Sequence, residues 1–349
     1  MMKNTILSFL ALFFIVVSVH AQQEKAMYDS LDLTKFKSGE VHEFWLKIVD
    51  DGRGVPMLVP VIVYKGKKNG PVLGVIAAIH GNELNGIAVI HTLKTKLPDP
   101  SQMAGTIILV PGLNIPGIIN EQREFNDGQD LNRLFPGKKR GDTSQQYVYN
   151  LYRKLIVPMD YLVDLHTASF GRTNSLYVRA DMKDEALRNF ALLQPADIIL
   201  NSDGAPSASN TGSGETLRAY AHRNNIPGIT IELGNPQVFQ TDYTDRGAEG
   251  ILQIITYLKI IKGQLNYNNT AQVCVKSYWI YTSKGGYLYN VPELNKQVLK
   301  GDIIGTLKDS FGEIIEEYFA PENGIIIGNS SNPVSQTGGR IVHLGVMKE

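Results

Sequence analysis

The sequence predicts an α/β domain with a mixed sheet flanked by helices, followed by a small all-β domain. From about residue 40 to 262, apolar runs rich in β-branched residues alternate with longer amphipathic segments, which is the pattern of a sheet covered by helices. A polar, turn-forming segment at 263–270 breaks this rhythm. After it come short β-rich pieces separated by glycine and proline signals, which are typical of a small barrel or sandwich.

Within the first domain, apolar runs predict strands, and segments with apolar residues at helical spacing predict covering helices. The predicted strands are Met57–Tyr64, Val72–Ile79, Thr106–Val110, Tyr161–Leu165, Ser175–Val178 and Gly228–Leu233. The predicted helices are Leu84–Leu97, Ser144–Val157 and Asp245–Lys262. We expect the two domains to cover residues 22–265 and 266–349.

Residues 1–21 look like a secretory signal peptide. Lys3 precedes an apolar run from Ile6 to Val19, and Val19-His20-Ala21 has the small residues of a cleavage site. The alternative is an uncleaved anchor, but the run falls short of the roughly 20 residues that a membrane span needs. No later segment is apolar enough to span a bilayer. We therefore expect an exported protein, either periplasmic or secreted.

Composition argues against two classes of protein. Charge is balanced, with 34 basic and 34 acidic residues, so the global electrostatic footprint of a nucleic-acid binder is missing. Cys274 is the single cysteine, so the chain is not a disulfide scaffold. We expect Cys274 to be an inert buried thiol. The composition does not indicate an oligomeric state.

The strand Val72–Ile79 runs directly into His80-Gly81-Asn82-Glu83, and a second apolar run delivers Asp164-Leu165-His166. Two histidines and one carboxylate are a ligand set of catalytic zinc, with the fourth position left for water. Because open α/β sheets bind ligands outside the carboxyl ends of their strands, His80, Glu83 and His166 are expected in one cleft. The alternative for His80 and Glu83 is a loop histidine beside a solvated glutamate in the first turn of a helix.

Two further carboxylates accompany these residues. Asp164 shares a strand face with His166, so it is a candidate to orient the imidazole of His80 or His166; the alternative is a structural hydrogen bond at a strand end. Glu232 lies at the carboxyl end of the apolar run Gly228–Leu233, where an unpaired buried carboxylate would be costly. We interpret Glu232 as a general base or acid; the alternative is an outward-facing side chain on an alternating strand.

The polar, irregular stretch from Arg123 to Gly137 is typical of a binding loop. The planar fork of Arg133 suits a substrate carboxylate, and Asn132 can add a directional hydrogen bond. Arg123 can polarise a scissile carbonyl or stabilise its oxyanion. The alternative is a set of salt bridges on a surface loop.

In chain order, four motifs resemble those of the succinylglutamate desuccinylase/aspartoacylase family, which is related to the zinc carboxypeptidases. These motifs are His80 to Glu83, Asp130 to Gly137, Asp164 to His166 and Ile231 to Gly234. The resemblance implies a carboxypeptidase-like mixed sheet, one zinc ion per chain and a general base. It assigns zinc to His80, Glu83 and His166, the base to Glu232, and substrate contacts to Arg123, Asn132 and Arg133.

The C-terminal region resembles the β domain of the same family, which is similar to a lipoyl or biotinyl barrel. The resemblance is carried by Gly285 to Leu288, Lys300 to Gly305 and Ala320 to Ile325. The lysine-bearing attachment motif of such carriers is missing. We therefore expect a structural or cleft-covering module instead of a cofactor carrier.

Two other features are expected to carry no chemistry. The glycine-rich stretch Thr211 to Thr216 lacks the lysine of a phosphate loop, so we expect it near the mouth of the site. His42, His91, His222 and His343 have no ligand-like neighbours at useful spacing, so we expect them to be structural or at the surface.

Together these observations predict an exported zinc-dependent hydrolase that cleaves an amide bond, with an ester bond as the alternative, in a small N-acyl substrate bearing a carboxylate. Zinc-bound water would be the nucleophile and Glu232 the base. One alternative is an exported metallocarboxypeptidase that acts on peptides or cell-wall stem peptides. The other is a non-catalytic carboxylate-binding protein, although a pure binder needs no Glu232. The sequence leaves the acyl group and the amine open.

Overall fold

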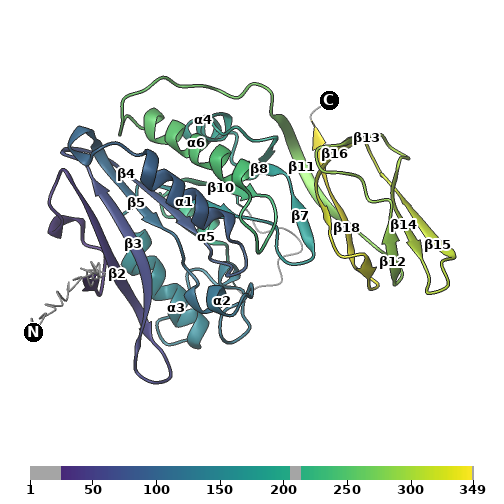
Figure 1. Ribbon diagram of the computed structural model, residues 1–349, viewed down its shortest axis with the longest axis horizontal. Helices are drawn as coiled ribbons and strands as arrows, with labels where there is room; N and C mark the ends of the chain where they lie inside the picture. The colour runs from purple at the N-terminus through teal and green to yellow at the C-terminus, as the bar shows by residue number, and fades with distance from the viewer. Residues whose placement is uncertain (1–24, 205–213, 348–349) are drawn as a thin grey trace, which may run out of the picture.

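The structure is a computed structural model that describes residues 25–204 and 214–347. Figure 1 shows a large sheet flanked by helices and, beside it, a β-rich C-terminal part. The predicted signal peptide lies outside the described residues. Within the described ranges, no helix combines the length and the hydropathy that crossing a membrane requires.

The first part of the chain alternates strands and helices, and the last part contains strands only. The helices are α1 (Asn85–Lys96), α2 (Ile115–Ile119), α3 (Thr143–Leu151), α4 (Glu185–Leu192), α5 (Leu217–Arg223) and α6 (Thr241–Tyr257). The strands before the predicted boundary are β1 (Met27–Tyr28), β2 (Glu40–Asp50), β3 (Pro56–Lys65), β4 (Lys68–Ala77), β5 (Ala104–Val110), β6 (Tyr161–His166), β7 (Arg172–Asn174), β8 (Leu176–Ala180), β9 (Ile198–Asn201) and β10 (Gly228–Leu233). The strands after it are β11 (Gln272–Tyr281), β12 (Gly286–Tyr289), β13 (Gln297–Val298), β14 (Ile303–Lys308), β15 (Ile314–Phe319), β16 (Gly324–Ser330), β17 (Val334–Ser335) and β18 (Arg340–Met347).

One mixed sheet runs through most of the described chain, in the order β1-β2-β3-β5-β4-β6-β10-β8-β9-β11-β18-β16-β13, with β7 paired to β16. At its centre, β4, β6 and β10 are parallel neighbours. Parallel strands of this kind are buried on both faces, which explains their continuous apolar sequences. The predicted mixed α/β sheet is confirmed. Each of the six predicted strands is present: Gly228–Leu233 has the predicted ends, and the ends of the others differ by up to four residues.

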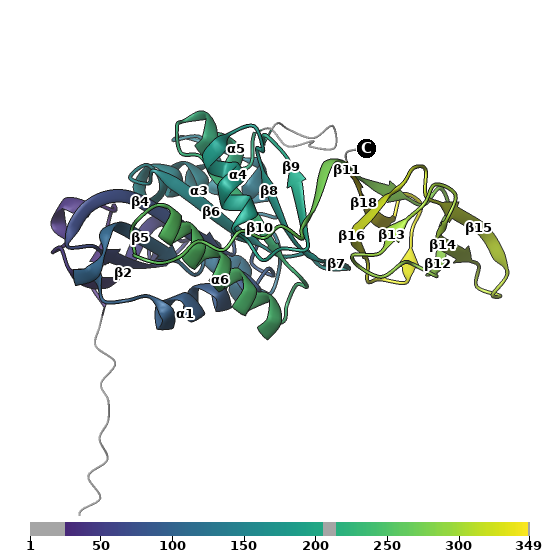
Figure 2. The same cartoon turned by 90° about the horizontal axis from the view of Figure 1, so that it is seen from above.

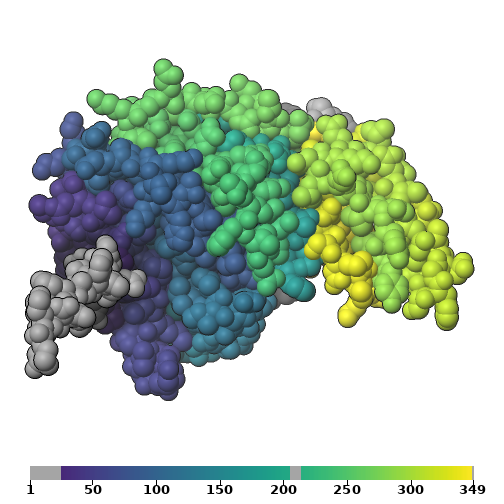
Figure 3. All heavy atoms as spheres, in the orientation of Figure 1, coloured from purple at the N-terminus to yellow at the C-terminus, as the bar shows by residue number. Residues whose placement is uncertain are grey.

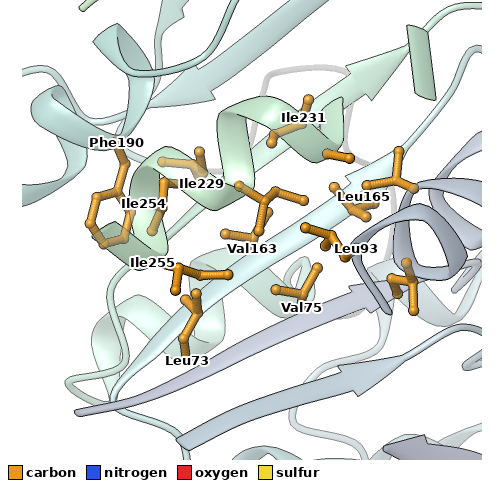
Figure 4. Close-up of a cluster of buried hydrophobic side chains, with 14 of the residues drawn as sticks. Leu73, Val75, Leu93, Val163, Leu165, Phe190, Ile229, Ile231, Ile254 and Ile255 are labelled. Carbon is orange, nitrogen blue, oxygen red and sulfur yellow. The ribbon is translucent and has the colours of Figure 1, made fainter. Parts of the chain in front are cut away.

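Helices cover both faces of this sheet, with α1 and α6 on one side and α3 and α5 on the other (Figure 2). Alternate residues of each central strand therefore enter different cores. Leu73 and Val75 of β4 pack in the cluster with α1 and α6, whereas Ile76 packs in the cluster with α3. Figure 4 shows Val163 and Ile229 of neighbouring strands facing side chains of α6 in the first cluster. This packing fixes which strand ends meet at the sheet edge.

The helix predicted as Leu84–Leu97 differs from α1 by one residue at each end, and the other two predicted helices differ more. The segment predicted as Ser144–Val157 is α3 as far as Leu151 and then a π-helical turn over Tyr152–Ile156. The segment predicted as Asp245–Lys262 begins earlier and ends at Tyr257. It ends there because Lys259 adopts a left-handed conformation with φ of 58°, after which the carbonyl of Ile260 accepts a hydrogen bond from Ala104. A local periodicity does not reveal these long-range contacts.

The described C-terminal part consists of β-strands and their connections, as predicted, but it does not form an isolated unit. Strand β11 pairs with β9 on one side and β18 on the other, and β16 pairs with β7. A second sheet, β15-β14-β12-β17, completes this part. In Figure 3 its yellow and yellow-green atoms lie directly against the larger part of the molecule. The resemblance to a lipoyl or biotinyl barrel stays a prediction.

Cys274 on β11 is fully buried in a cluster with Tyr177, Ile198 and Ile327. Burial raises the pKa of its thiol from 9.0 to about 11. The stability that the buried neutral thiol contributes is therefore complete below pH 9.0 and is lost as the pH rises towards 11. At neutral pH we expect a thiol reagent such as dithionitrobenzoate to label the unfolded chain quickly and the native chain slowly. Equal labelling rates in the two states would contradict this burial.

Candidate metal centre and active-site cavity

The predicted site residues meet where the central parallel strands end. His80 follows β4 by three residues, and His166 is the last residue of β6. Glu232 stands beside His166 in the register of β10 and β6. Because β4, β6 and β10 run in the same direction, their carboxyl ends place these three side chains along one edge of the sheet.

A tight backbone turn delivers His80 and Glu83 to that edge. After β4 ends at Ala77, Ala78 adopts a left-handed conformation with φ of 55°. The turn is held by hydrogen bonds from Leu113 N to Ala77 O (3.0 Å) and from Asn114 N to Ala78 O (2.9 Å). A Cβ atom on Gly81 would lie 2.0 Å from a backbone carbon of Gly117, so this position accepts only glycine. Backbone packing therefore requires the glycine of His-Gly-Asn-Glu.

The side chains of His80, Glu83 and His166 converge in a buried cluster. One carboxylate oxygen of Glu83 lies 3.0 Å from Nδ1 of His80, and the other lies 2.9 Å from Nδ1 of His166. The three donor atoms all lie within 4.8 Å of one another. The residues are 3%, 2% and 5% exposed, respectively. Such a set of converging donors has the composition of a zinc site.

The hydrogen bonding of the imidazoles supports a cation at this point. Among the described residues, the buried Nδ1 of His80 has no hydrogen-bond partner, although Glu83 is near. The opposite nitrogen of each ring is backed by a carboxylate: Nε2 of His80 lies 3.0 Å from Asp130, and Nε2 of His166 lies 3.0 Å from Asp164. Carboxylates behind ligating imidazoles fix the tautomer that directs the other nitrogen to a metal. The residues therefore fit a bound zinc ion.

The charges of this cluster also favour a cation. Burial alone would raise the pKa of Glu83, but His80 and His166 outweigh it and lower that pKa well below its usual value. Burial would lower the pKa of His166, but Asp164 and Glu83 raise it well above the usual value. The cluster therefore stabilises positive charge next to the carboxylate of Glu83. A divalent cation would replace the proton that His166 carries.

Asp130 is a site residue whose role the sequence pattern does not reveal. Its Oδ1 contacts Nε2 of His80, and its Oδ2 accepts from Arg123. Asp130 also accepts from the backbone N–H of Asn132, which fixes the short 3₁₀ turn Leu131–Arg133. It lies 50 residues from His80 in the sequence, so only the folded chain shows the pair. The only local indication of Asp130 was its place at the start of the polar motif Asp130 to Gly137.

Replacing Asp130 with Asn should weaken zinc binding about 10- to 100-fold, because the neutral amide holds the His80 ring less firmly. Competition with a chromogenic chelator measures this change. The matched control is Asp127→Asn in the same loop, where the carboxylate accepts from Ser144 and Gln129 and contacts no metal-binding candidate. Equal zinc affinities for wild type and Asp130→Asn would remove Asp130 from the metal centre.

Arg123 lies inside the cluster. It donates from Nη1 to Glu83 (2.8 Å) and from Nε and Nη2 to Asp130 (3.2 and 2.8 Å). Three of the five guanidinium N–H groups are therefore engaged, and two are left for a ligand. The structure places Arg123 next to the metal-binding candidates, and its contact with a scissile carbonyl stays a prediction.

Asn132 and Arg133 each have N–H groups that can donate to a ligand. The side-chain oxygen of Asn132 accepts from the backbone N–H of Leu217 (2.7 Å), so it satisfies one of the free N–H groups at the start of α5. Its amide NH₂ has no partner among the described residues. Arg133 donates to the carbonyl of Asn132 (2.7 Å) and has no ion pair in the described part of the chain. Both residues can therefore donate to a substrate carboxylate.

Glu232 is largely shielded, with a side chain 13% exposed. Its Oε2 accepts from the amide of Asn174 (3.2 Å), and its Oε1 lies 3.7 Å from Nε of Arg179. The predicted outward-facing alternative is wrong, because this carboxylate faces the same cavity as His166. Two neighbours thus hold a carboxylate next to the metal-binding candidates.

All eight predicted site residues line one cavity of about 580 Å³. The wall also contains residues that no sequence motif singles out, namely Arg172, Tyr177, Arg179, Arg218, Trp279 and Arg340. A wider surface hollow of about 740 Å³, beside α6 and residues 266–270, contains no histidine and none of the predicted site residues. We therefore assign the chemistry to the smaller cavity.

Two minor expectations have definite outcomes. His343 is buried, as a structural residue would be, but it also lines the cavity. His42, His91 and His222 do not line it. Part of the glycine-rich stretch, Thr211 to Ser213, lies outside the described residues. The following Glu215 and Thr216 line the cavity, in the position expected of a loop near the site.

Comparison with known proteins shows the family of this chain. The family model described as the succinylglutamate desuccinylase/aspartoacylase catalytic domain matches residues 69–258, more than half of the chain. One similar protein is the N-alpha-acetyl-L-2,4-diaminobutyric acid deacetylase of Halomonas elongata, which is 24% identical over 307 residues, covering 83% of this chain and 87% of that protein.

Solved structures share the fold over nearly their whole length. The product-bound ectoine utilization protein EutE (DoeB) of Ruegeria pomeroyi is 20% identical, with a TM-score of 0.77 and coverage of 89% of this chain and 97% of that chain. A succinylglutamate desuccinylase/aspartoacylase of Rhodobacter sphaeroides is 19% identical, with a TM-score of 0.79 and coverage of 92% and 100%. The chain belongs to the succinylglutamate desuccinylase/aspartoacylase family.

Proposed function

We propose that this protein is a zinc-dependent deacylase that hydrolyses the amide bond of a small N-acyl compound bearing a carboxylate. One observation carries the proposal: the buried donors of His80, Glu83 and His166 converge in a cavity that also presents the carboxylate of Glu232 and the guanidinium of Arg133, which has no ion pair among the described residues. The three metal-binding candidates alone would also fit a site that only binds a ligand. Hydrolysis requires in addition a general base, and the carboxylate of Glu232 is placed to act as one.

His80, Glu83 and His166 would hold the zinc, oriented by Asp130 and Asp164. Zinc in this position supplies Lewis acidity towards a carbonyl group and makes water nucleophilic at neutral pH. Arg123 compensates the negative charge of Glu83 and Asp130 from the side. The backbone turn at Ala78 and Gly81 gives the ligands fixed positions before any metal arrives.

Glu232 takes the proton that the attacking water loses and returns it to the departing amine. This role needs a carboxylate that is shielded from bulk water and cannot rotate freely. The contacts of Glu232 with Asn174 and Arg179 meet both needs. The amide of Asn174 donates to only one carboxylate oxygen, so the other oxygen has capacity to accept a proton.

Arg133 and Asn132 orient the substrate through its carboxylate. A guanidinium fork matches a carboxylate with two parallel hydrogen bonds, and the Asn132 amide adds a third donor. The two remaining N–H groups of Arg123 point to a second role, which is to stabilise negative charge that develops on the carbonyl oxygen. These donors act together only on a substrate whose carboxylate and amide are close in the molecule.

The similar proteins guide the choice of substrate. The Halomonas elongata relative is named for N-alpha-acetyl-L-2,4-diaminobutyric acid, an acetylated amino acid of this general kind. The apolar N-terminal run and Ala21 add to the proposal that this protein is exported and meets its substrate in the periplasm or outside the cell. Small N-acyl amino acids present there are the class we propose.

The test is amine release from a panel of N-acyl amino acids, peptides and cell-wall stem peptides by the zinc-loaded full chain. The proposal expects activity on N-acyl amino acids, its loss after chelation and its return with zinc. Activity on peptides alone would favour the metallocarboxypeptidase alternative. Binding that survives chelation, with no hydrolysis of any panel member, would favour the carboxylate-binding alternative.

A further inference from the structure

The small sheet β15-β14-β12-β17 has one buried face and one exposed face. Figure 1 shows β12, β14 and β15 at the end of the molecule remote from the helices. On the inner face, Leu288, Leu307 and Tyr318 pack in a buried cluster with Ile326 and Ile341 of the larger sheet. The opposite face, which we call the outer face, carries six large apolar side chains that are 41% to 59% exposed: Tyr287, Tyr289, Ile303, Ile314, Phe319 and Val334. An exposed apolar patch of this kind marks an interaction surface.

The strand register fixes the layout of the outer face. Residues directly opposite each other on paired antiparallel strands point to the same face of the sheet. Three rows therefore cross this face: Val334, Tyr287, Lys308 and Ile314 form the first, Tyr289, Thr306 and Glu317 the second, and Ile303 and Phe319 the third. The ammonium of Lys308 lies 5.1 Å from the ring centre of Tyr289, as two side chains on one face require.

Two opposite charges stand among these apolar side chains. Lys308 on β14 and Glu317 on β15 are diagonal neighbours on the outer face. Neither forms an ion pair within residues 25–204 and 214–347, whereas the inward-facing Glu316 lies 4.0 Å from Lys284. The outer face as a whole has no net formal charge. An anionic partner such as nucleic acid or an acidic membrane would require an excess of basic residues, so this face fits a partner that is itself neutral and apolar.

The outer face is complementary to itself. A two-fold axis that lies parallel to the face and passes between Lys308 and Glu317 would bring two copies of the face together. It would set Lys308 opposite the partner's Glu317 and Glu317 opposite the partner's Lys308, so that one axis forms two ion pairs. The same rotation lays Tyr287 over the third row of the other copy, where apolar residues meet apolar residues. A symmetric dimer requires such self-complementarity, and two sheets pack face to face in this way.

We propose that the outer face is a dimer interface, which binds a second copy of this chain through reciprocal Lys308–Glu317 ion pairs and the surrounding apolar side chains. The three rows are fewer than the roughly 20–30 residues a side of a standard interface, so we expect a reversible dimer with micromolar affinity. None of the residues in the three rows lines the catalytic cavity, so both cavities stay open in the dimer. The proposal does not depend on the proposed function.

Charge reversal at these two positions tests both the interface and its occupant. Sedimentation equilibrium across micromolar concentrations should show a monomer–dimer equilibrium for the unsubstituted chain. Lys308→Glu and Glu317→Lys each set like charges opposite each other, so each variant should associate with itself at least about 10-fold more weakly. An equal mixture of the two variants should dimerise again. The Lys308→Glu chain is acidic at both positions and the Glu317→Lys chain is basic at both, so they complement each other. Two misfolded variants would not restore the dimer.

The matched control is Lys296→Glu. Lys296 is exposed in the C-terminal part of the chain, as Lys308 is, but it lies between the strands and outside the small sheet. This variant makes the same change of charge and should keep the dissociation constant of the unsubstituted chain. Phe319→Ser removes an exposed apolar side chain from the third row and should also weaken the dimer, because less apolar area is buried on association.

Three results would overturn the proposal. The first is an unsubstituted chain that stays monomeric at every concentration, including one that instead binds lipid vesicles or a polysaccharide through Tyr287 and Tyr289. The second is a dimer whose dissociation constant is the same in Lys308→Glu and Glu317→Lys, since another face then forms it. The third is a mixture of these two variants that stays monomeric, because the two-fold arrangement requires their complementarity. Amine release by the chain is unaffected by any of these results, so the proposed deacylase function is tested separately.

Discussion

Replacing Glu232 with Gln should lower the rate of amide hydrolysis about 10²- to 10⁴-fold while zinc stays bound. Glutamine keeps the shape and the contact with Asn174, but it cannot accept the proton of the attacking water. Glu232 makes no contact with His80 or His166 through a hydrogen bond, so the metal ligands are undisturbed. Turnover per bound zinc, with zinc measured by atomic emission, gives the result.

The matched control is Glu215→Gln, a second carboxylate of the cavity, which pairs with Arg223 at 2.7 Å. Its rate should fall much less than that of Glu232→Gln. A Glu232→Asp variant with intermediate activity would further show that the carboxylate itself is needed. Full activity in Glu232→Gln would remove this residue from the mechanism.

Replacing His80 with Ala should abolish both zinc binding and turnover. The substitution removes one of three buried donors and leaves Asp130 without its imidazole partner. Zinc should also cease to stabilise the fold: at a free zinc concentration about 100 times the Kd, a binder gains about 2.7 kcal/mol, which the variant would lose. Thermal unfolding with and without added zinc measures this difference.

His91→Ala is the control for His80→Ala, because His91 is exposed on α1 and lies outside the cavity. It should keep its zinc, its turnover and the rise in unfolding temperature on zinc addition. If His80→Ala still binds one zinc per chain with unchanged affinity, the metal lies elsewhere. If it loses zinc but keeps its turnover, the hydrolysis does not depend on the metal.

The cluster of His80, Glu83 and His166 was predictable because the positions of these residues depend on local sequence pattern and on strand direction. Apolar runs that end in polar residues predicted β4, β6 and β10, and parallel pairing then brought His80, His166 and Glu232 to one edge. Glu83 follows His80 by three residues, so the same turn delivers it. These four residues could therefore be placed together without knowing the long-range contacts of the fold.

The remaining wall of the cavity was not predictable in the same way. Arg172 reaches it because β7 pairs with β16, and Arg340 because β18 pairs with β11. These contacts join residues far apart in the sequence, such as Arg172 with Ser330 and Arg340 with Tyr281, and nothing in the local sequence indicates them. Asp130 was missed for a similar reason, since its role depends on His80 across a long loop. The end of α6 likewise follows from a contact between Ile260 and Ala104.

The most direct test of the central claim is an anomalous difference map at the zinc edge, from crystals of the zinc-loaded protein. We expect one peak per chain, from a zinc ion held by Nδ1 of His80, Nδ1 of His166 and the carboxylate of Glu83, with Glu232 close but not bound. A peak at other residues, or no peak in a protein that hydrolyses its substrate, would contradict the proposed zinc centre.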